Sequence, residues 1–283
     1  MKFGANTMIW EWPFTTESLA LLPKIKRMGF DAAEFTIDKP TDLDYTVARE
    51  AFAKTGLEPL VCAILSFEHD LINDDRSVRE AGKDYLKHCI DAVVAVGGTH
   101  VSGPIYAAVG RKELWSDEEK ARLWDMCAEG LSEVAGYAAA RGVVLGLEPL
   151  NRFETSFINT AEQAVRMVQM VNSPALGVHL DTFQMNPEEK SEADAIELAG
   201  KYLVNFHACE NDRGIPGSGS IPWQSIAKAL KKVNYDHFVV IETFVTAIKG
   251  ITGAAIWRPL APSQDAVAEV GLQFLKGLFA PFE

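Results

Sequence analysis

Residues 133–148 read EVAGYAAARGVVLGLE, and this stretch contains the pattern that decides the fold. Its first part is rich in alanine, Gly142 follows, and the run from Val143 to Leu147 is apolar and partly β-branched. Glycine readily adopts the left-handed conformation that ends a helix. The stretch therefore predicts a helix, a stop and a buried strand that leads directly to Glu148.

The same order of helix, glycine and strand recurs along the chain. Glycine separates the two elements at Gly29, Gly56 and Gly97, and the second half continues the alternation with weaker punctuation. The predicted strands lie near residues 2–7, 32–37, 59–65, 99–103, 143–148, 175–181, 202–208 and 238–243. Strands that alternate with helices indicate a parallel sheet covered on both faces. Eight strands in 283 residues are typical of an α/β protein of the closed (β/α)8 class, the TIM barrel.

An open doubly wound sheet would show the same alternation. Such a sheet usually has a glycine-rich phosphate loop after its first strand, and residues 4–12 contain no GxGxxG. No linker rich in Ser, Gly or Pro divides the chain, so we predict a single domain over residues 1–283. Pro23 interrupts the first helical pattern and should kink that helix or end it early. Longer segments follow three of the strands and should border the active site at the C-terminal face of the barrel, namely residues 67–77, 104–117 and 211–223.

Composition excludes several classes of function. The chain has 39 acidic against 27 basic residues, a net charge of −12, so we expect no nucleic-acid partner, because such binding needs a basic face. No apolar run approaches the roughly 20 residues that cross a bilayer, and the opening residues do not resemble a signal peptide. The four cysteines show no CxxC spacing, as in a cytoplasmic protein with reduced thiols.

Four predicted strands end in a residue that can bind a cation. Their separations are 33, 26 and 35 residues, each close to one strand and helix unit, and the four are Glu148, Asp181, His207 and Glu242. In a parallel barrel this spacing places the four side chains at the same level, around the opening at the C-terminal ends of the strands. A single such residue is more often a helix cap or a core histidine, but four in register are hard to explain as caps.

Three carboxylates and one imidazole in a small volume would repel one another, and a divalent cation would relieve that repulsion. A donor set of mostly oxygen with one nitrogen suits Mn²⁺, Co²⁺ or Mg²⁺ better than a structural zinc ion. A six-coordinate ion would keep two positions for neighbouring oxygens of a substrate such as an α-hydroxyketone. His179 lies two residues before Asp181 and faces the same side of its strand, but we interpret it as a lower barrel residue and exclude it from the ligands.

The motifs around these residues resemble a known family. LEPLNRFE, LDTFQMN, HACENDRGIPGSGSIPW, VIETF and IWR are similar to segments of the D-tagatose 3-epimerase and D-allulose (psicose) 3-epimerase group. That group belongs to the xylose-isomerase-like TIM-barrel superfamily of sugar isomerases and epimerases. The likeness covers most of the chain and is densest between Glu148 and Phe244.

The resemblance implies a divalent-metal-dependent ketose 3-epimerase that inverts C3 of a free ketose or related keto-sugar. Glu148, Asp181, His207 and Glu242 would bind one metal ion per subunit, with Mn²⁺ the first choice. Glu148 and Glu242 would also be the catalytic acid and base, acting through a metal-stabilised cis-enediolate. It also implies a homo-oligomer, which we expect to be a homodimer or homotetramer.

Other residues are assigned to the substrate on the same basis. Glu154 and Arg213 match residues that hold the O1 and O2 end of the substrate, and Trp257 belongs with Arg258 to the IWR-like segment. Two positions depart from the family pattern: Gln184 stands where LDTFHM usually has a histidine, and Asn6 replaces a common aromatic residue. Both departures concern which ketose is preferred.

Three other functions remain open. An aldose-ketose isomerase, or a lyase or isomerase of 3-keto-glycosides, could use the same metal site. A nuclease of the endonuclease IV type would need more histidines than the six in this chain, and a basic surface. A sugar-binding barrel without catalysis would need no acid and base at all.

Overall fold

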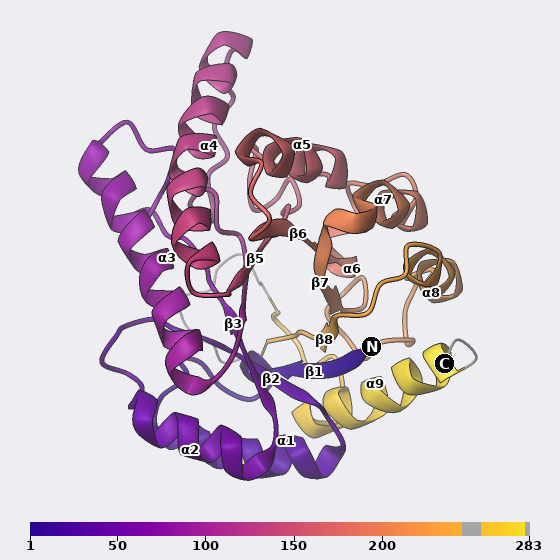
Figure 1. The fold of residues 1–283 in the computed structure, drawn as a ribbon. Coiled ribbons are helices and arrows are strands. Elements are labelled where there is room, and N and C mark those ends of the chain that lie inside the picture. The colour runs from indigo at the N-terminus through magenta and orange to yellow at the C-terminus, as the bar shows by residue number, and fades with distance from the viewer. Residues whose placement is uncertain (245–255, 281–283) are drawn as a thin grey trace.

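The computed structural model describes residues 1–244 and 256–280. Eight parallel strands form a closed barrel in which each strand pairs with its neighbours in the sequence and β1 pairs with β8 (Figure 1). The predicted (β/α)8 barrel is therefore confirmed. The strands are β1 Lys2–Asn6, β2 Ala32–Thr36, β3 Glu58–Cys62, β4 His100–Gly103, β5 Val144–Leu147, β6 Leu176–Asp181, β7 Leu203–Ala208 and β8 Phe238–Ile241.

Helices surround the barrel, and most of them fall between successive strands (Figure 1). The α-helices are α1 Leu22–Met28, α2 Tyr45–Thr55, α3 Arg76–Val96, α4 Asp117–Ala139, α5 Ala161–Val171, α6 Thr182–Met185, α7 Glu192–Ala199, α8 Trp223–Lys232 and α9 Gln264–Phe279. Short 3-10 helices are η1 Thr7–Ile9, η2 Glu17–Leu21 and η3 Gly200–Tyr202. Within residues 1–244 and 256–280, no helix is both long and apolar enough to cross a membrane.

Local sequence signals explain where these helices begin and end. Gly29, Gly56 and Gly97 follow α1, α2 and α3 in the left-handed conformation, as the glycine pattern predicts. Asn172 has the same role after α5, with φ of 49°. The prediction for Pro23 was wrong, because this proline stands in the first turn of α1, where a missing N–H costs no hydrogen bond.

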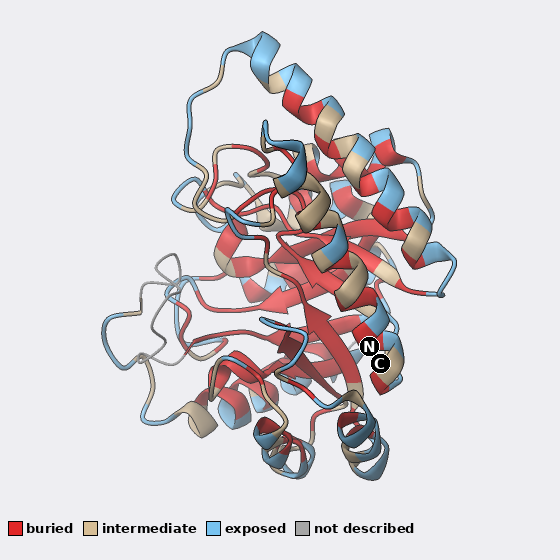
Figure 2. Ribbon diagram, turned by 90° about the vertical axis from the view of Figure 1, so that its left-hand side faces the viewer, coloured by how far each residue is buried: buried red, intermediate tan, exposed pale blue. Residues whose placement is uncertain are grey.

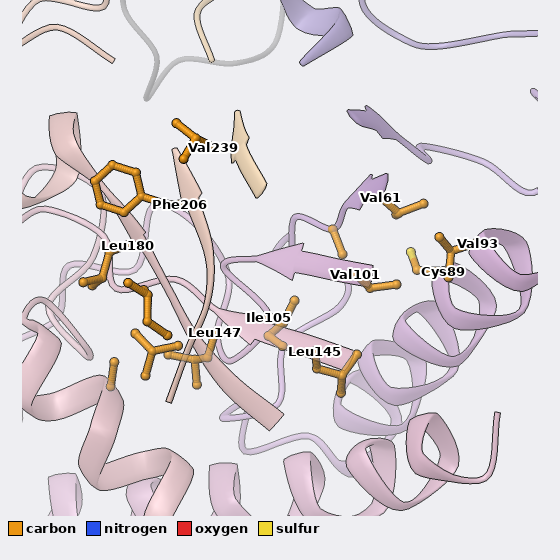
Figure 3. Close-up of a cluster of buried hydrophobic side chains, with 14 of the residues drawn as sticks. Val61, Cys89, Val93, Val101, Ile105, Leu145, Leu147, Leu180, Phe206 and Val239 are labelled. Carbon is orange, nitrogen blue, oxygen red and sulfur yellow. The ribbon is translucent and has the colours of Figure 1, made fainter. Parts of the chain in front are cut away.

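The main hydrophobic core lies between the barrel and its helices (Figure 2). Alternate residues of each strand point outward, as Val61 and Val101 do next to Cys89 and Val93 of α3 (Figure 3). The other residues of each strand point into the barrel, where the lower end is closed by an apolar cluster that includes Leu60 and Phe238. The opposite end of the barrel, at the C-termini of the strands, contains polar side chains.

Candidate active site

The four predicted cation-binding residues lie at the C-terminal ends of neighbouring strands. Glu148 and Glu242 come directly after β5 and β8, Asp181 ends β6, and His207 lies in β7 directly opposite Asp181 in the strand register. None of the four is more than 5% exposed. The barrel therefore brings these four buried side chains to one end of its interior.

Within this end of the barrel the donor atoms form two adjacent groups. One donor atom from each of Glu148, His179 and His207 lies within 4.8 Å of the others, and the same holds for Asp181, Cys209 and Glu242. His207 links the two groups, because its Nδ1 lies 3.4 Å from Oε2 of Glu242. Each group contains one member that our ligand prediction left out, His179 in the first and Cys209 in the second.

Arg213 lies between the carboxylates of the second group. Its Nη1 donates to Oδ2 of Asp181 at 2.8 Å and to Oε2 of Glu242 at 2.6 Å, and the residue is only 4% exposed. A guanidinium nitrogen thus holds a positive charge between two of the predicted ligands. Phe183 and Phe244 stack on this guanidinium, with their ring centroids 4.1 and 5.0 Å from its central carbon.

A buried carboxylate holds the loop that carries Arg213. Oε1 of Glu210 accepts hydrogen bonds from the backbone N–H of Gly217 and the indole N–H of Trp223, at 2.8 and 2.7 Å. A Cβ at Gly219 would lie 2.4 Å from Oε2 of the same carboxylate, so a larger residue would push the Glu210 side chain out of this position. The predicted tight turn in GIPGSGSIPW therefore closes around Glu210. Arg213 itself has φ of 66°, a left-handed conformation that is uncommon for a residue with a side chain.

Glu34 of β2 supports His207 from inside the barrel. Oε2 of Glu34 lies 2.8 Å from Nε2 of His207 and accepts a hydrogen bond of the same length from Nδ2 of Asn6. Histidines that bind metals commonly have a carboxylate at their second nitrogen, which fixes the ring and leaves the first nitrogen free to bind. Our sequence interpretation missed Glu34, although a glutamate inside the apolar run FDAAEFTI was a signal that could have identified it.

The electrostatics of the two glutamates differ. Burial raises the pKa of Glu148 well above its usual value, and the negative charge of Glu242 adds to this effect. Burial alone would also raise the pKa of Glu242, but the charges of Arg213 and His207 outweigh it and lower that pKa to about 2. Carboxyl groups whose surroundings push their pKa values apart are suited to opposite roles, one as an acid and one as a base.

Glu154 and Gln184 lie in one hydrogen-bonded group beside this site. Oε1 of Gln184 accepts from the backbone N–H of Asn151 at 2.8 Å, and its Nε2 donates to Oε1 of Glu154 at 3.2 Å. Nδ2 of Asn151 also donates to Oε1 of Glu154 at 2.7 Å. An inner cavity is lined by both predicted residues together with Glu148, Arg213 and Glu242. Burial raises the pKa of Glu154.

Trp257 lies further out. It is 85% exposed and lines an outer cavity of about 490 Å³, in which Arg258, Phe153 and Phe183 also take part. Glu154 and Arg213 line both the inner and the outer cavity. The structure thus brings Glu154, Gln184 and Arg213 next to the predicted ligands, whereas Trp257 contributes only to the outer wall.

Comparisons with known proteins agree with this architecture. A ketose 3-epimerase of Arthrobacter globiformis is 33% identical over 280 residues, which cover 98% of this chain and 96% of that protein. A D-psicose 3-epimerase of Agrobacterium fabrum is 32% identical, over 94% of this chain and 93% of that protein. The crystal structure of a D-allulose 3-epimerase from Methylomonas sp. in complex with D-allulose has a TM-score of 0.91 and 27% sequence identity, and covers 98% of this chain and 96% of that one.

A family model describes the relation most generally. The model of the xylose isomerase-like TIM barrel matches residues 22–277, which include every strand of the barrel except β1. Together with the ketose 3-epimerases that are similar over nearly the whole length, this match means that the chain belongs to the xylose isomerase-like TIM barrel family.

Proposed function

We propose that this protein is a divalent-metal-dependent epimerase that inverts C3 of a free ketose or a related keto-sugar. The observation that carries the proposal is geometric: two buried glutamates, Glu148 and Glu242, lie at the ends of barrel strands beside a cluster of further donor atoms. The relatives named ketose 3-epimerase and D-psicose 3-epimerase support the same reaction.

The donor set fits a divalent cation. Asp181 and Glu242 share one guanidinium, Glu148 is a third buried carboxylate beside them, and Nδ1 of His207 has no hydrogen bond of good geometry among the described residues. Buried polar atoms of this kind are costly without a partner. We propose Glu148, Asp181, His207 and Glu242 as the ligands of one ion per subunit, with Mn²⁺ first and Co²⁺ or Mg²⁺ as alternatives.

The bound cation would polarise the ketone and a neighbouring hydroxyl oxygen and so stabilise the negative charge of the enediolate. Glu242, which is ionised at neutral pH, would take the proton from C3 on one face of the sugar. Glu148, the second carboxyl group of the pair, would return a proton to C3 on the other face. In the reverse direction the two residues would exchange roles.

The remaining residues would bind and orient the sugar. Arg213 offers a fork of N–H donors for the O1 and O2 end of the substrate once it leaves the carboxylates. Glu154 and Gln184 would bind further hydroxyl groups, and their mutual hydrogen bonds keep them in fixed positions. Trp257 would cover the substrate from the outer cavity, because aromatic rings pack well against the apolar C–H faces of sugars.

Two further proposals concern the protein as a whole. We propose a homodimer or homotetramer, because Phe67, Leu114 and Phe153 are large apolar side chains that lie 57% to 101% exposed in the single chain. Light scattering coupled to size-exclusion chromatography would give the number of subunits. We also propose a cytoplasmic location, since all four cysteines are buried and free of disulfides.

The test is to incubate the protein with Mn²⁺ and D-fructose, D-tagatose or L-ribulose in D₂O. An epimerase should produce the C3 epimer with deuterium at C3, and a chelator should stop the reaction. Exchange at C1 and C2 would instead indicate an aldose-ketose isomerase, and elimination from a 3-keto-glycoside would indicate a lyase. Glu148→Gln and Glu242→Gln should each lower the rate at least about 100-fold, whereas the surface variant Glu133→Gln should retain it.

A further inference from the structure

His179 lies inside the barrel, and among the described residues it has no hydrogen-bond partner. The residue is fully buried, with 0% exposed surface, and neither Nδ1 nor Nε2 has a hydrogen bond among the described residues. A buried imidazole has at least one N–H to donate and one lone pair to share, and leaving either unpaired costs free energy. A group other than the described residues should therefore contact this ring.

The ring is directed toward the candidate active site. Nδ1 of His179 lies 3.8 Å from Oε2 of Glu148, and its ring meets that of His207 edge to face with the centroids 4.1 Å apart. One donor atom of each of these three residues lies within 4.8 Å of the other two. Ligands of one cation at bond lengths of about 2.1 Å lie up to about 4.2 Å from one another, so small side-chain rotations would suffice.

The backbone makes room for this imidazole. A Cβ at Gly146 of β5 would lie 3.1 Å from the Cβ of His179 and 2.9 Å from that of Ser102, so a larger residue would press against both side chains. The pairing of β6 with β7 also shifts register between Val178 and His179. Such irregularities re-aim side chains and are frequent next to active sites.

We propose that His179 is a further ligand of the cation, so that in the substrate-free protein two imidazoles bind the ion instead of one. His207 would offer Nδ1, because Glu34 lies at its Nε2, and His179 would offer its own Nδ1 from the side of Glu148. The inference deepens the proposed function and rests on it only in assuming that a cation binds at these strand ends.

A second imidazole has a consequence for the choice of metal. Imidazole is a good ligand for Co²⁺ and Ni²⁺, whereas Mg²⁺ prefers oxygen, and affinities for the transition metals rise from Mn²⁺ to Ni²⁺. His179 should therefore strengthen the binding of Co²⁺ far more than that of Mg²⁺. A residue that only filled space in the barrel would have no such selective effect.

The experiment uses the full chain with its metal removed and then loaded with Co²⁺. Calorimetry measures the affinity for Co²⁺ and Mg²⁺, and proton NMR of the Co²⁺ protein counts bound imidazoles through their exchangeable, strongly shifted N–H signals. The variants are His179→Leu, which removes an unpaired polar ring and should fold, and His179→Gln, which keeps hydrogen bonding. His100→Gln is the matched control, because His100 begins β4 at the other end of the barrel.

We expect two such N–H signals in the wild type and in His100→Gln, and one in both His179 variants. The affinity for Co²⁺ should fall at least about tenfold in both His179 variants, because even residues behind the ligands change metal affinity by 10 to 100-fold. Affinity for Mg²⁺ should change much less. One signal in the wild type, or equal losses for Co²⁺ and Mg²⁺, would overturn the proposal.

These outcomes are separate from a failure of the proposed function. A wild-type protein that epimerises D-fructose but shows only one bound imidazole would refute the role of His179 and leave the epimerase proposal intact. A protein that binds Co²⁺ through two imidazoles but converts none of the ketoses would support the role of His179 and refute the epimerase proposal.

Discussion

Nη1 of Arg213 lies 2.8 Å from Oδ2 of Asp181, and the same nitrogen also bonds to Glu242. The guanidinium therefore neutralises two of the carboxylates that we propose as metal ligands. Both the cation and Arg213 need these oxygens, so we expect Arg213 to turn away from them when the ion binds. Phe183 and Phe244 stack on the guanidinium, and Arg213 also lines the outer cavity. The side chain can therefore turn toward that cavity.

Replacing Arg213 by glutamine should make folding depend on the metal. Without the guanidinium, Asp181 and Glu242 are buried charges with fewer partners, and breaking a buried ion pair in this way costs about 3 to 5 kcal/mol. Urea unfolding of the metal-free variant should show this loss. Saturating Mn²⁺ should stabilise the variant more than the wild type, because it replaces the missing charge. Equal stabilisation of both proteins would mean that Arg213 and the cation do not compete.

Replacing Glu34 by glutamine should weaken metal binding without removing any proposed ligand. The change takes away the negative charge at Nε2 of His207, which lies 2.8 Å from Glu34 and helps to orient the ring. Removing a hydrogen-bond partner of a metal-binding histidine typically lowers the metal affinity about 10 to 100-fold. Calorimetric titration with Mn²⁺ measures the effect. The control is Glu58→Gln, because Glu58 lies on the neighbouring strand β3 and its side chain is 46% exposed. An unchanged affinity would remove Glu34 from the site.

Replacing Gln184 by alanine should affect the substrate and not the metal. The change leaves the backbone N–H of Asn151 without its partner and frees the carboxylate of Glu154 on one side. The loss of one or two hydrogen bonds corresponds to about a tenfold rise in KM. We expect an unchanged affinity for Mn²⁺, and a shift among ketoses in Gln184→His, which restores the histidine common in the resembling family. A variant with a tenfold weaker affinity for Mn²⁺ and an unaltered KM would contradict this role.

The pH dependence of stability should report on His100. Burial, with a smaller effect of His237, lowers the pKa of His100 to about 4 from its ordinary value of 6.5. Between these two pH values the unfolded chain binds a proton that the folded protein does not. The stability from the neutral ring is therefore complete above pH 6.5 and falls as the pH drops toward 4.

His100→Gln should reduce this acid dependence. Urea unfolding at pH 7 and at pH 4.5 would give the loss of free energy of unfolding for the wild type and the variant. We expect a smaller loss in the variant, because glutamine binds no proton in this range. The same loss in both proteins would show that other groups cause the acid dependence.

The barrel could be predicted from the sequence because glycine stops and apolar runs are local signals. The predicted strand near residues 175–181 agrees with β6, Leu176–Asp181, to within one residue, and the ends of the other predicted strands agree to within three residues. Pro23 was misjudged because its effect depends on where the helix begins, and the preceding residues form the separate 3-10 helix η2. The start of a helix is set by tertiary packing as well as by local sequence.

The site was predictable only in part for a related reason. Residues at strand ends, such as Asp181 and Glu242, share one height in the barrel, so their periodic spacing identified them. Glu34 lies within β2 and Cys209 follows β7, so neither belongs to the periodic series of strand-end residues. The contact of Arg213 with Asp181 joins residues 32 positions apart through a loop whose course depends on Glu210. No local pattern in the sequence specifies that course.

The most direct test of the account is the position of the cation. Crystals of the protein soaked with Mn²⁺ would show the ion by its anomalous scattering. We predict one peak per subunit within bonding distance, about 2.0 to 2.4 Å, of Glu148, Asp181, His207 and Glu242 together. A peak that contacts none of these four residues, or no peak at a saturating Mn²⁺ concentration, would contradict the account.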